Sequence, residues 1–239
     1  SGELGENTLM RIHGSSIKAK IGGQELVSGA TISNNTWHHI CFERTSTTQF
    51  YLYVDGVGTA SSGFSSHSIA TNSVTIANHK VDGGDNTENF DGYIDEVRIS
   101  NVARYSGTNF TPSTTAFTSD SDTQLLIHSN ESSESTTFTD SSSNAHTITV
   151  AGNIKHQPPV KKIGTSSLYF PKTSANINTQ NYIAISDDAT WDYGAGDFTW
   201  EMWVNVTAID RQMKIFGSEG WSDGGAYDWV FDINPNRTL

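Results

Sequence analysis

Cysteine and proline are scarce in this chain, and the scarcity narrows what can stabilise it. Among 239 residues there are five prolines and one cysteine, Cys41. A single cysteine cannot form a disulfide within the chain, so the fold must be held together by its hydrophobic core. Two small domains or one large unit would both fit this length, and one closed unit is the more economical interpretation.

Positive charge is also in short supply. Lys and Arg number 14 against 26 Asp and Glu, which gives a formal net charge of −12, and no basic run is longer than Lys161–Lys162. Binding to a phosphate backbone needs clustered cations, so we expect no nucleic-acid partner. No transmembrane run or signal peptide is visible, and we expect no membrane insertion. The acidic balance suits a soluble extracellular module and divalent cations, and colloidal solubility alone would account for it as well.

Short strands joined by polar turns account for most of what is present. Glycine is abundant, at 21 residues, and Ser, Thr and Asn crowd the segments between apolar runs, a pattern that favours an all-β fold. In the segment 50–54 apolar residues alternate, and Asp55–Gly56 then predicts a tight turn. The same alternation assigns seven residues to the core: Ile40, Phe42, Leu52, Val54, Phe198, Trp200 and Met202.

The segment 92–99 departs from this alternation. Ile94 is out of phase with Val97 and Ile99, so we predict a β-bulge near Asp95–Glu96 that restores the phase.

Two sets of motifs resemble a known family. SLYF at 167–170, YIAI at 182–185 and GDFTWEMWVN at 196–205 form one set, and WHHI at 37–40, LYVDGV at 52–57 and GYIDEVRI at 92–99 form the other. Both resemble the LamG-like domain, a concanavalin A-like lectin/glucanase jelly roll, of the tandem-repeat type found in bacteriophage tail and virion proteins. In that family the first set precedes the second, whereas here the order is reversed.

The resemblance implies a fold and a domain organisation. We expect an all-β, concanavalin A-like jelly-roll β-sandwich of two antiparallel sheets, circularly permuted. Residues 1–111 would form the C-terminal-type half, 112–122 a linker, and 123–239 the N-terminal-type half, with both halves in one sandwich. The function that follows is a non-enzymatic interaction or adhesion module of an extracellular or virion fibre.

A carbohydrate surface is the first candidate site. Sugar recognition needs an aromatic platform beside carboxylate, amide or imidazole groups, and outward-facing positions of three predicted strands supply such a set: Trp203, Glu201, His39, Tyr51 and Tyr53. A glycan or cell-surface receptor would be the partner. Alternatively, a loop or a neighbouring repeat covers these aromatics and the chain is a purely structural spacer in a fibre.

Calcium is the second candidate. Hard cations need several oxygen ligands, which two loops offer, one through Asp82, Asp85 and Asn86 and the other through Asp140. In either loop the same residues could instead form Asx turns that bond their own backbone. No further cofactor is expected.

Glycoside hydrolysis is the weakest of the three candidates. Asp91, Tyr93 and Asp95 share one face of a strand, with tyrosine at a position where a catalytic pattern would have a carboxylate. Asp95 and Glu96 are adjacent, so in a regular strand they would face opposite sides and could not act as a pair. We therefore expect no enzymatic activity.

Overall fold

The protein is a sandwich of two antiparallel β-sheets. The computed structural model describes residues 15–21, 24–66, 68, 73–77, 89–172, 181–210, 213–218 and 229–233. In this part of the chain the single helical element is a 3-10 turn, Ala189–Trp191. The strands are β1 (Ser16–Ile21), β2 (Gln24–Thr31), β3 (Trp37–Ser46), β4 (Gln49–Val54), β5 (Val57–Ala60), β6 (Val74–Ile76), β7 (Gly92–Ser100), β8 (Thr123–Ile127), β9 (Ile148–Ala151), β10 (Lys155–Gln157), β11 (Ser167–Phe170), β12 (Tyr182–Ile185), β13 (Phe198–Val206), β14 (Met213–Ser218) and β15 (Trp229–Ile233).

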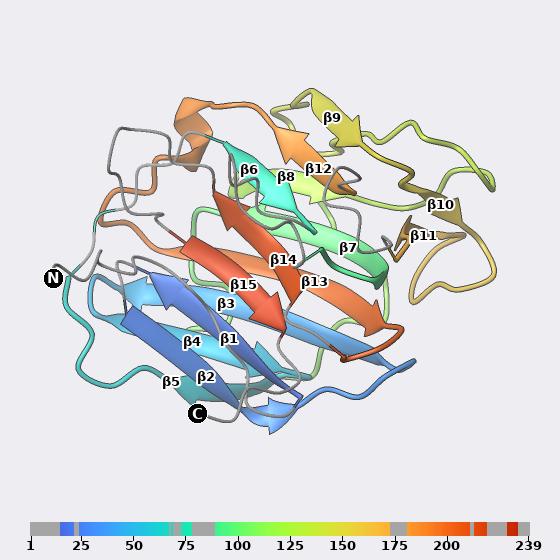
Figure 1. Ribbon diagram of the computed structural model, residues 1–239. Coiled ribbons are helices and arrows are strands. Elements are labelled where there is room, and N and C mark those ends of the chain that lie inside the picture. Colours follow the sequence, from blue (N-terminus) through green and yellow to red (C-terminus); the bar gives the residue numbers. More distant parts are fainter. Residues whose placement is uncertain are drawn as a thin grey trace, which may run out of the picture.

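Each of the two sheets combines strands from the first half of the chain with strands from the second half. The seven-stranded sheet has the order β2-β1-β15-β14-β6-β12-β9, and the eight-stranded sheet has the order β10-β11-β7-β13-β3-β4-β5, with β8 also paired to β7. Figure 1 shows the seven-stranded sheet in front of the eight-stranded one. The all-β, two-sheet prediction is confirmed, while the circular permutation remains a prediction.

The core lies between the sheets and contains all seven residues assigned to it from the sequence. Ile40, Phe42, Leu52, Val54, Phe198, Trp200 and Met202 are each no more than 1% exposed. Phe198 stacks on Trp200 with a centroid separation of 4.6 Å, and Phe42 packs against Phe198 at 5.5 Å. Burial of side chains this large contributes about 1.5–3 kcal/mol each, so this aromatic cluster is a main source of stability in a chain without a disulfide.

A bulge in β7 decides which of its side chains reach the outer face. The register between β7 and β13 shifts between Glu201 and Trp203, and Glu96 has a φ of 52°. The extra residue lets Ile94 and Val97 both enter the core, while Asp95 and Glu96 both contact loops outside it. The predicted bulge is confirmed.

The Asp55–Gly56 turn, also predicted, joins β4 to β5. Both residues have positive φ, 51° and 78°, as a tight hairpin turn requires. A Cβ on Gly56 would lie 1.8 Å from the carbonyl oxygen of Phe110, so only glycine fits here.

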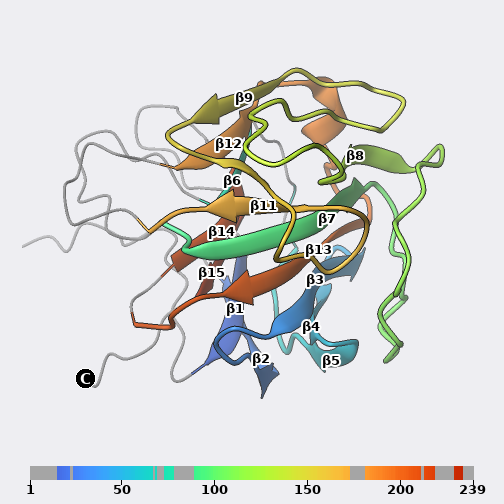
Figure 2. The ribbon, with the colours of Figure 1, turned by 90° about the vertical axis from the view of Figure 1, so that its right-hand side faces the viewer.

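The segment 101–122, which we call the strap, connects β7 to β8. Figure 2 shows it on the right, on the side of the eight-stranded sheet that faces away from the seven-stranded sheet. We call this side the outer face. Ring contacts between the strap and side chains of β3 and β4 confirm the placement.

Truncation of the aromatic core should be costly. Phe198→Ala or Trp200→Ala should lower the free energy of unfolding by about 3–5 kcal/mol. Each substitution leaves a cavity between the two sheets, and the hydrogen bonds between strands keep the sheets from collapsing into it. Chemical denaturation measures this, with Val57→Ala, at a position 52% exposed, as a control expected to change stability by less than about 0.5 kcal/mol. A loss below about 1 kcal/mol at Phe198 would contradict the assignment of the core.

Candidate functional site

The five residues predicted to bind carbohydrate do gather on the outer face. Trp203 and His39 are cross-strand neighbours with ring centroids 5.2 Å apart, and His39 Nε2 lies 3.2 Å from Glu201 Oε2. Tyr51 and Tyr53 stack at 6.1 Å on β4. Period-two alternation thus places all five on one side of the sheet, as expected.

These residues do not form an open platform, and here the sequence-based prediction is wrong. Trp203 is 5% exposed, Glu201 1%, and His39 and Tyr53 are fully buried, whereas Tyr51 is half-buried. A saccharide cannot stack on rings that protein already covers. The physical reason is that two segments fold back over this part of the sheet.

The strap is the first covering segment. The ring of Phe110 lies 5.6 Å from that of His39 and 5.2 Å from that of Tyr53, and Phe117 is 6.3 Å from His39. Phe117, only 5% exposed, lies within 112–122, so the stretch predicted to be a linker is packed against the sheet.

The loop 158–166 is the second covering segment. Lys162 Nζ lies 3.9 Å from the ring centroid of Trp203, in cation–π geometry. Backbone N–H groups of Lys162 and Ile163 both donate to Asp95 Oδ2 at 3.0 Å. Trp203 is therefore closed off by a loop that Asp95 holds in place.

Buried carboxylates hold the strap in the same manner. Glu43 accepts hydrogen bonds from the backbone N–H groups of Tyr105 (2.6 Å), Ser106 (3.2 Å) and Gly107 (3.1 Å). Consecutive positive φ angles of 51° and 77° at Ser106 and Gly107 turn these donors toward one point, as in an anion-binding nest. Further along, Glu96 accepts from the N–H of Phe117 at 2.7 Å.

Glu201 forms the centre of a buried ionic cluster. Arg98 donates to its Oε1 from Nε (2.8 Å) and Nη2 (2.6 Å), and Tyr105 and His39 both reach Oε2. Burial alone would raise the pKa of Glu201, but the hydrogen bond from His39, the charge of Arg98 and the Tyr105 hydroxyl hold it at about 2. Glu201 is therefore ionised at neutral pH and anchors Tyr105 of the strap.

The second predicted calcium ligand set is already occupied by hydrogen bonds. Asp140 Oδ1 accepts from the N–H groups of Leu126 and Ser142 (2.9 Å each), and Oδ2 accepts from Ser142 Oγ (2.8 Å) and the N–H of His146 (2.9 Å). Four donors saturate the carboxylate, so the prediction of Asp140 as a calcium ligand is wrong in this arrangement and the Asx-type alternative holds.

The first predicted calcium loop, with Asp82, Asp85 and Asn86, lies outside the described residues and remains a prediction. Within the parts of the chain that are described, no cluster of three or more His, Cys, Asp or Glu is arranged to hold a metal ion. The described helical structure also includes no element long and apolar enough to span a membrane.

A row of side chains next to the covered region stays partly accessible. Cross-strand pairing places Tyr169 of β11 beside Tyr93 of β7, Tyr93 beside Asn205 of β13, and Asn205 beside Trp37 of β3. All lie in phase with the outward residues Asp95, Trp203 and His39. The three aromatic residues are half-buried and Asn205 is 7% exposed. We call these four residues the open row.

The polar groups of the open row are not used in hydrogen bonds to other described residues. Within the described residues, the hydroxyls of Tyr93 and Tyr169, the indole N–H of Trp37 and the amide of Asn205 make no hydrogen bond. The Tyr93 and Tyr169 rings stack with centroids 5.0 Å apart. The alternation in the sequence predicts that these residues lie on the outer face. It could not show which part of that face the loops leave uncovered.

Asp95 should give the protein a pH dependence opposite to that of an ordinary carboxylate. Burial raises its pKa to about 7, against hydrogen bonds from Ile163 and Lys162 that lower it. Because the folded state favours the protonated form of Asp95, this group contributes its full stabilisation below the pKa of about 4 that it has in the unfolded chain. That stabilisation is lost as the pH rises to 7. Asp95→Asn should remove that loss.

Denaturation of both proteins between pH 4 and pH 8 measures this effect. Wild type should lose stability relative to Asp95→Asn as the pH rises across this window. A stability difference that stays constant with pH would contradict the raised pKa.

Comparison with known proteins agrees with the motifs and the fold. Residues 5–108 match the family model Laminin_G_3, described as the concanavalin A-like lectin/glucanases superfamily. No curated protein and no solved structure matched the chain. The matched segment includes β1 to β7 and hence the strands that carry Trp37 and Tyr93. Residues 5–108 are thus similar to a concanavalin A-like lectin/glucanase domain, and the two-sheet antiparallel architecture is consistent with that similarity.

Proposed function

We propose that this protein is a non-enzymatic carbohydrate-binding module that uses the open row of Tyr169, Tyr93, Asn205 and Trp37. The observation that carries the proposal is the row itself, three partly accessible aromatic side chains and one amide aligned across four adjacent strands. The similarity of residues 5–108 to a lectin/glucanase domain is compatible with this role.

The chemistry of the row suits sugars. The face of an aromatic ring carries partial negative charge and attracts the polarised C–H groups of a pyranose, while hydroxyl, indole and amide groups exchange hydrogen bonds with sugar hydroxyls. Asn205 lies in register between Tyr93 and Trp37, and its amide offers donors and an acceptor to a ligand on the row.

A non-enzymatic role is supported by the use made of the acidic residues on the outer face. Glu43 and Glu96 accept backbone N–H groups of the strap, and Glu201 is bound by Arg98, His39 and Tyr105. Carboxylates that act in glycoside hydrolysis must reach the substrate and exchange protons with it. Here the strap separates these three groups from any ligand on the open row.

A structural spacer in a fibre is the second candidate, favoured by the extent to which the protein covers its own outer face. In that case a neighbouring repeat or subunit, not a glycan, would pack on the open row. Aromatic residues are also enriched in protein–protein interfaces, so the open row fits contact with a neighbouring subunit as well.

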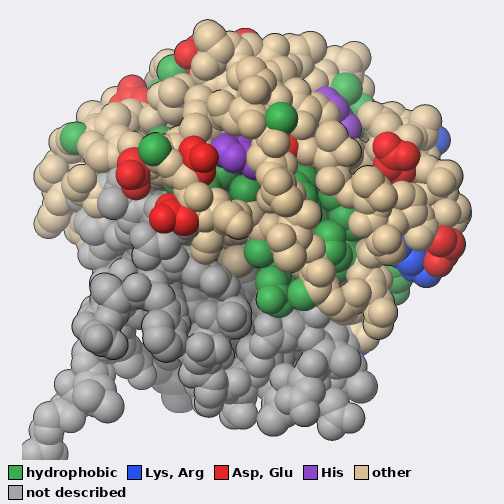
Figure 3. All heavy atoms as spheres, turned by 90° about the horizontal axis from the view of Figure 1, so that it is seen from above, with side chains coloured by type: hydrophobic (Ala, Val, Ile, Leu, Met, Phe, Trp, Pro, Cys, Tyr) green, Lys and Arg blue, Asp and Glu red, His purple; other side chains and the backbone are tan. Residues whose placement is uncertain are grey.

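The setting we propose is an extracellular or virion-surface fibre, with a glycan or cell-surface receptor as partner and neighbouring repeats beside it. Support comes from the tandem-repeat resemblance and from the acidic balance of the chain. Figure 3 shows acidic side chains distributed over the face seen from above. In a fibre, weak binding at each module would be strengthened by repetition, since linked sites raise the effective concentration.

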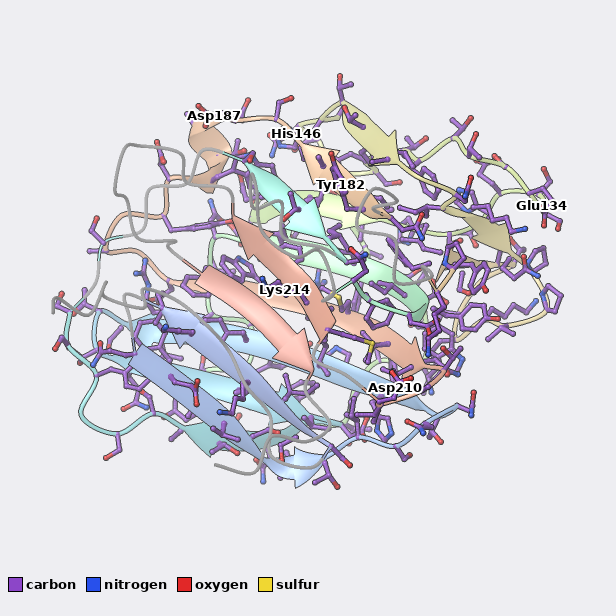
Figure 4. All side chains as sticks on the ribbon, in the orientation of Figure 1. Glu134, His146, Tyr182, Asp187, Asp210 and Lys214 are labelled. Atoms are coloured by element: carbon purple, nitrogen blue, oxygen red, sulfur yellow. The ribbon has the colours of Figure 1, made fainter. Side chains whose placement is uncertain are left out.

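Removal of the aromatic ring of Trp37 or of Tyr93 should weaken binding without unfolding the protein. Trp37→Ala and Tyr93→Ala should each weaken retention on a glycan array by about tenfold, through loss of stacking and of apolar contact area. The matched control is Tyr182→Ala, which removes a half-buried tyrosine from the seven-stranded sheet, near the top of Figure 4.

Two results would count against the proposal. Wild-type protein that is retained by no glycan would favour the spacer function. Equal loss of binding in the Tyr182 control would show that general destabilisation, not the open row, is responsible.

A further inference from the structure

A second row of cross-strand neighbours runs beside the open row, two residues away on each strand. Trp203 of β13 pairs with Asp95 of β7 on one side and with His39 of β3 on the other. The β7–β11 register, continued by one residue, places Ser167 next to Asp95, and Gln157 of β10 pairs with Ser167. We call these five residues the buried row.

Four members of the buried row carry a buried polar atom that has no hydrogen-bond partner among the described residues. The four atoms are Gln157 Oε1, Asp95 Oδ1, Trp203 Nε1 and His39 Nδ1. A buried polar atom without a partner costs stability, and native structures contain few of them. Four such atoms on one row therefore indicate a shared kind of partner that these side chains do not supply to one another.

The four atoms define what this partner must offer. The indole N–H of Trp203 can only donate, and Gln157 Oε1 can only accept. His39 Nε2 donates to the ionised Glu201, so Nδ1 of the neutral ring is an acceptor. Asp95 Oδ2 already accepts two backbone N–H groups, which leaves Oδ1 to accept when the carboxyl is ionised and to donate when it is protonated. The partner must therefore both donate and accept.

The cover over the buried row restricts the size of this partner. Asp95 and His39 are 0% exposed, and Trp203 is 5% exposed beneath Lys162. The Ser167 hydroxyl donates to a carbonyl oxygen of the loop 158–166 and so fixes that loop above the row. Water fits both requirements, because it is small and each molecule has two donors and two acceptors.

We propose that ordered water molecules occupy the buried row and bridge the indole N–H of Trp203 to the acceptors on its two neighbouring strands, Asp95 Oδ1 and His39 Nδ1. Internal water makes about three hydrogen bonds to buried polar groups, which matches this set. The row crosses five strands, about 19 Å at the usual inter-strand spacing, so a further molecule is needed to reach Gln157. The waters complete the cover, because they satisfy the polar side chains that the loop and the strap conceal.

Water contacts of the indole protons test the proposal in the whole chain. In ROESY spectra the Trp203 indole proton should give a cross-peak to water with the sign of a dipolar contact, which is opposite to the sign produced by chemical exchange. Trp191 is the matched control, because its indole is also buried but donates to Ser186 O at 3.1 Å and should give no such cross-peak. Absence of the cross-peak at Trp203, or an equal one at Trp191, would overturn the proposal.

Gln157→Leu gives a second readout at the end of the row. Leucine is similar in volume but lacks the oxygen. If water bonds Oε1, the substitution removes one of its partners and should lower the midpoint of chemical denaturation. If Oε1 has no partner, removal of an unsatisfied acceptor should raise the midpoint instead. A raised midpoint would overturn the proposed extension of water to Gln157.

Discussion

Buried carboxylates that accept backbone N–H groups are the interaction on which the outer face depends. Glu43 and Glu96 hold the strap, and Asp95 holds the loop over Trp203. A buried carboxylate without partners costs several kcal/mol, so each of these groups requires its loop to remain in place. The same contacts satisfy N–H groups of irregular backbone that would otherwise lack partners. The carboxylates therefore need the loops as hydrogen-bond donors, and the loops need the carboxylates as acceptors. Together they decide which part of the sheet a ligand can reach.

This constraint divides one continuous sheet face into two regions with different roles. Beneath the strap, Glu201 and Arg98 form a closed ionic cluster with Tyr105 of the strap, and this cluster contributes to structure. Beyond the covering loops, Tyr93 of β7 and Trp37 of β3 lie on the same outer face as this cluster, yet remain partly accessible. The bulge at Asp95–Glu96 contributes to the division, because it places two adjacent carboxylates where each can bind a different loop.

The parts of this arrangement that depend on local periodicity could be predicted from the sequence. Alternation assigned Phe198 and Trp200 to the core, and the phase break around Ile94 located the bulge. The same alternation placed Trp203 and Glu201 together on the outer face. It could not predict their burial, because the segments that cover them are distant in sequence. In addition, no sequence signature separates a glutamate that accepts a loop N–H from a solvent-exposed one. For the same reason Asn205 and Trp37 were not predicted as site residues.

The central claim is that ligand reaches the open row and not the covered cluster, and the indole N–H signals of the tryptophans test it directly. The chain has six tryptophans, of which Trp37 lies in the open row and Trp203 lies under Lys162. In NMR spectra recorded during titration with a glycan retained by the protein, assigned through Trp→Phe variants, the Trp37 indole signal should shift progressively and the Trp203 signal should stay in place. A shift of Trp203 with Trp37 unchanged would contradict the account, since it would mean that the covering loops open and that binding takes place beneath them.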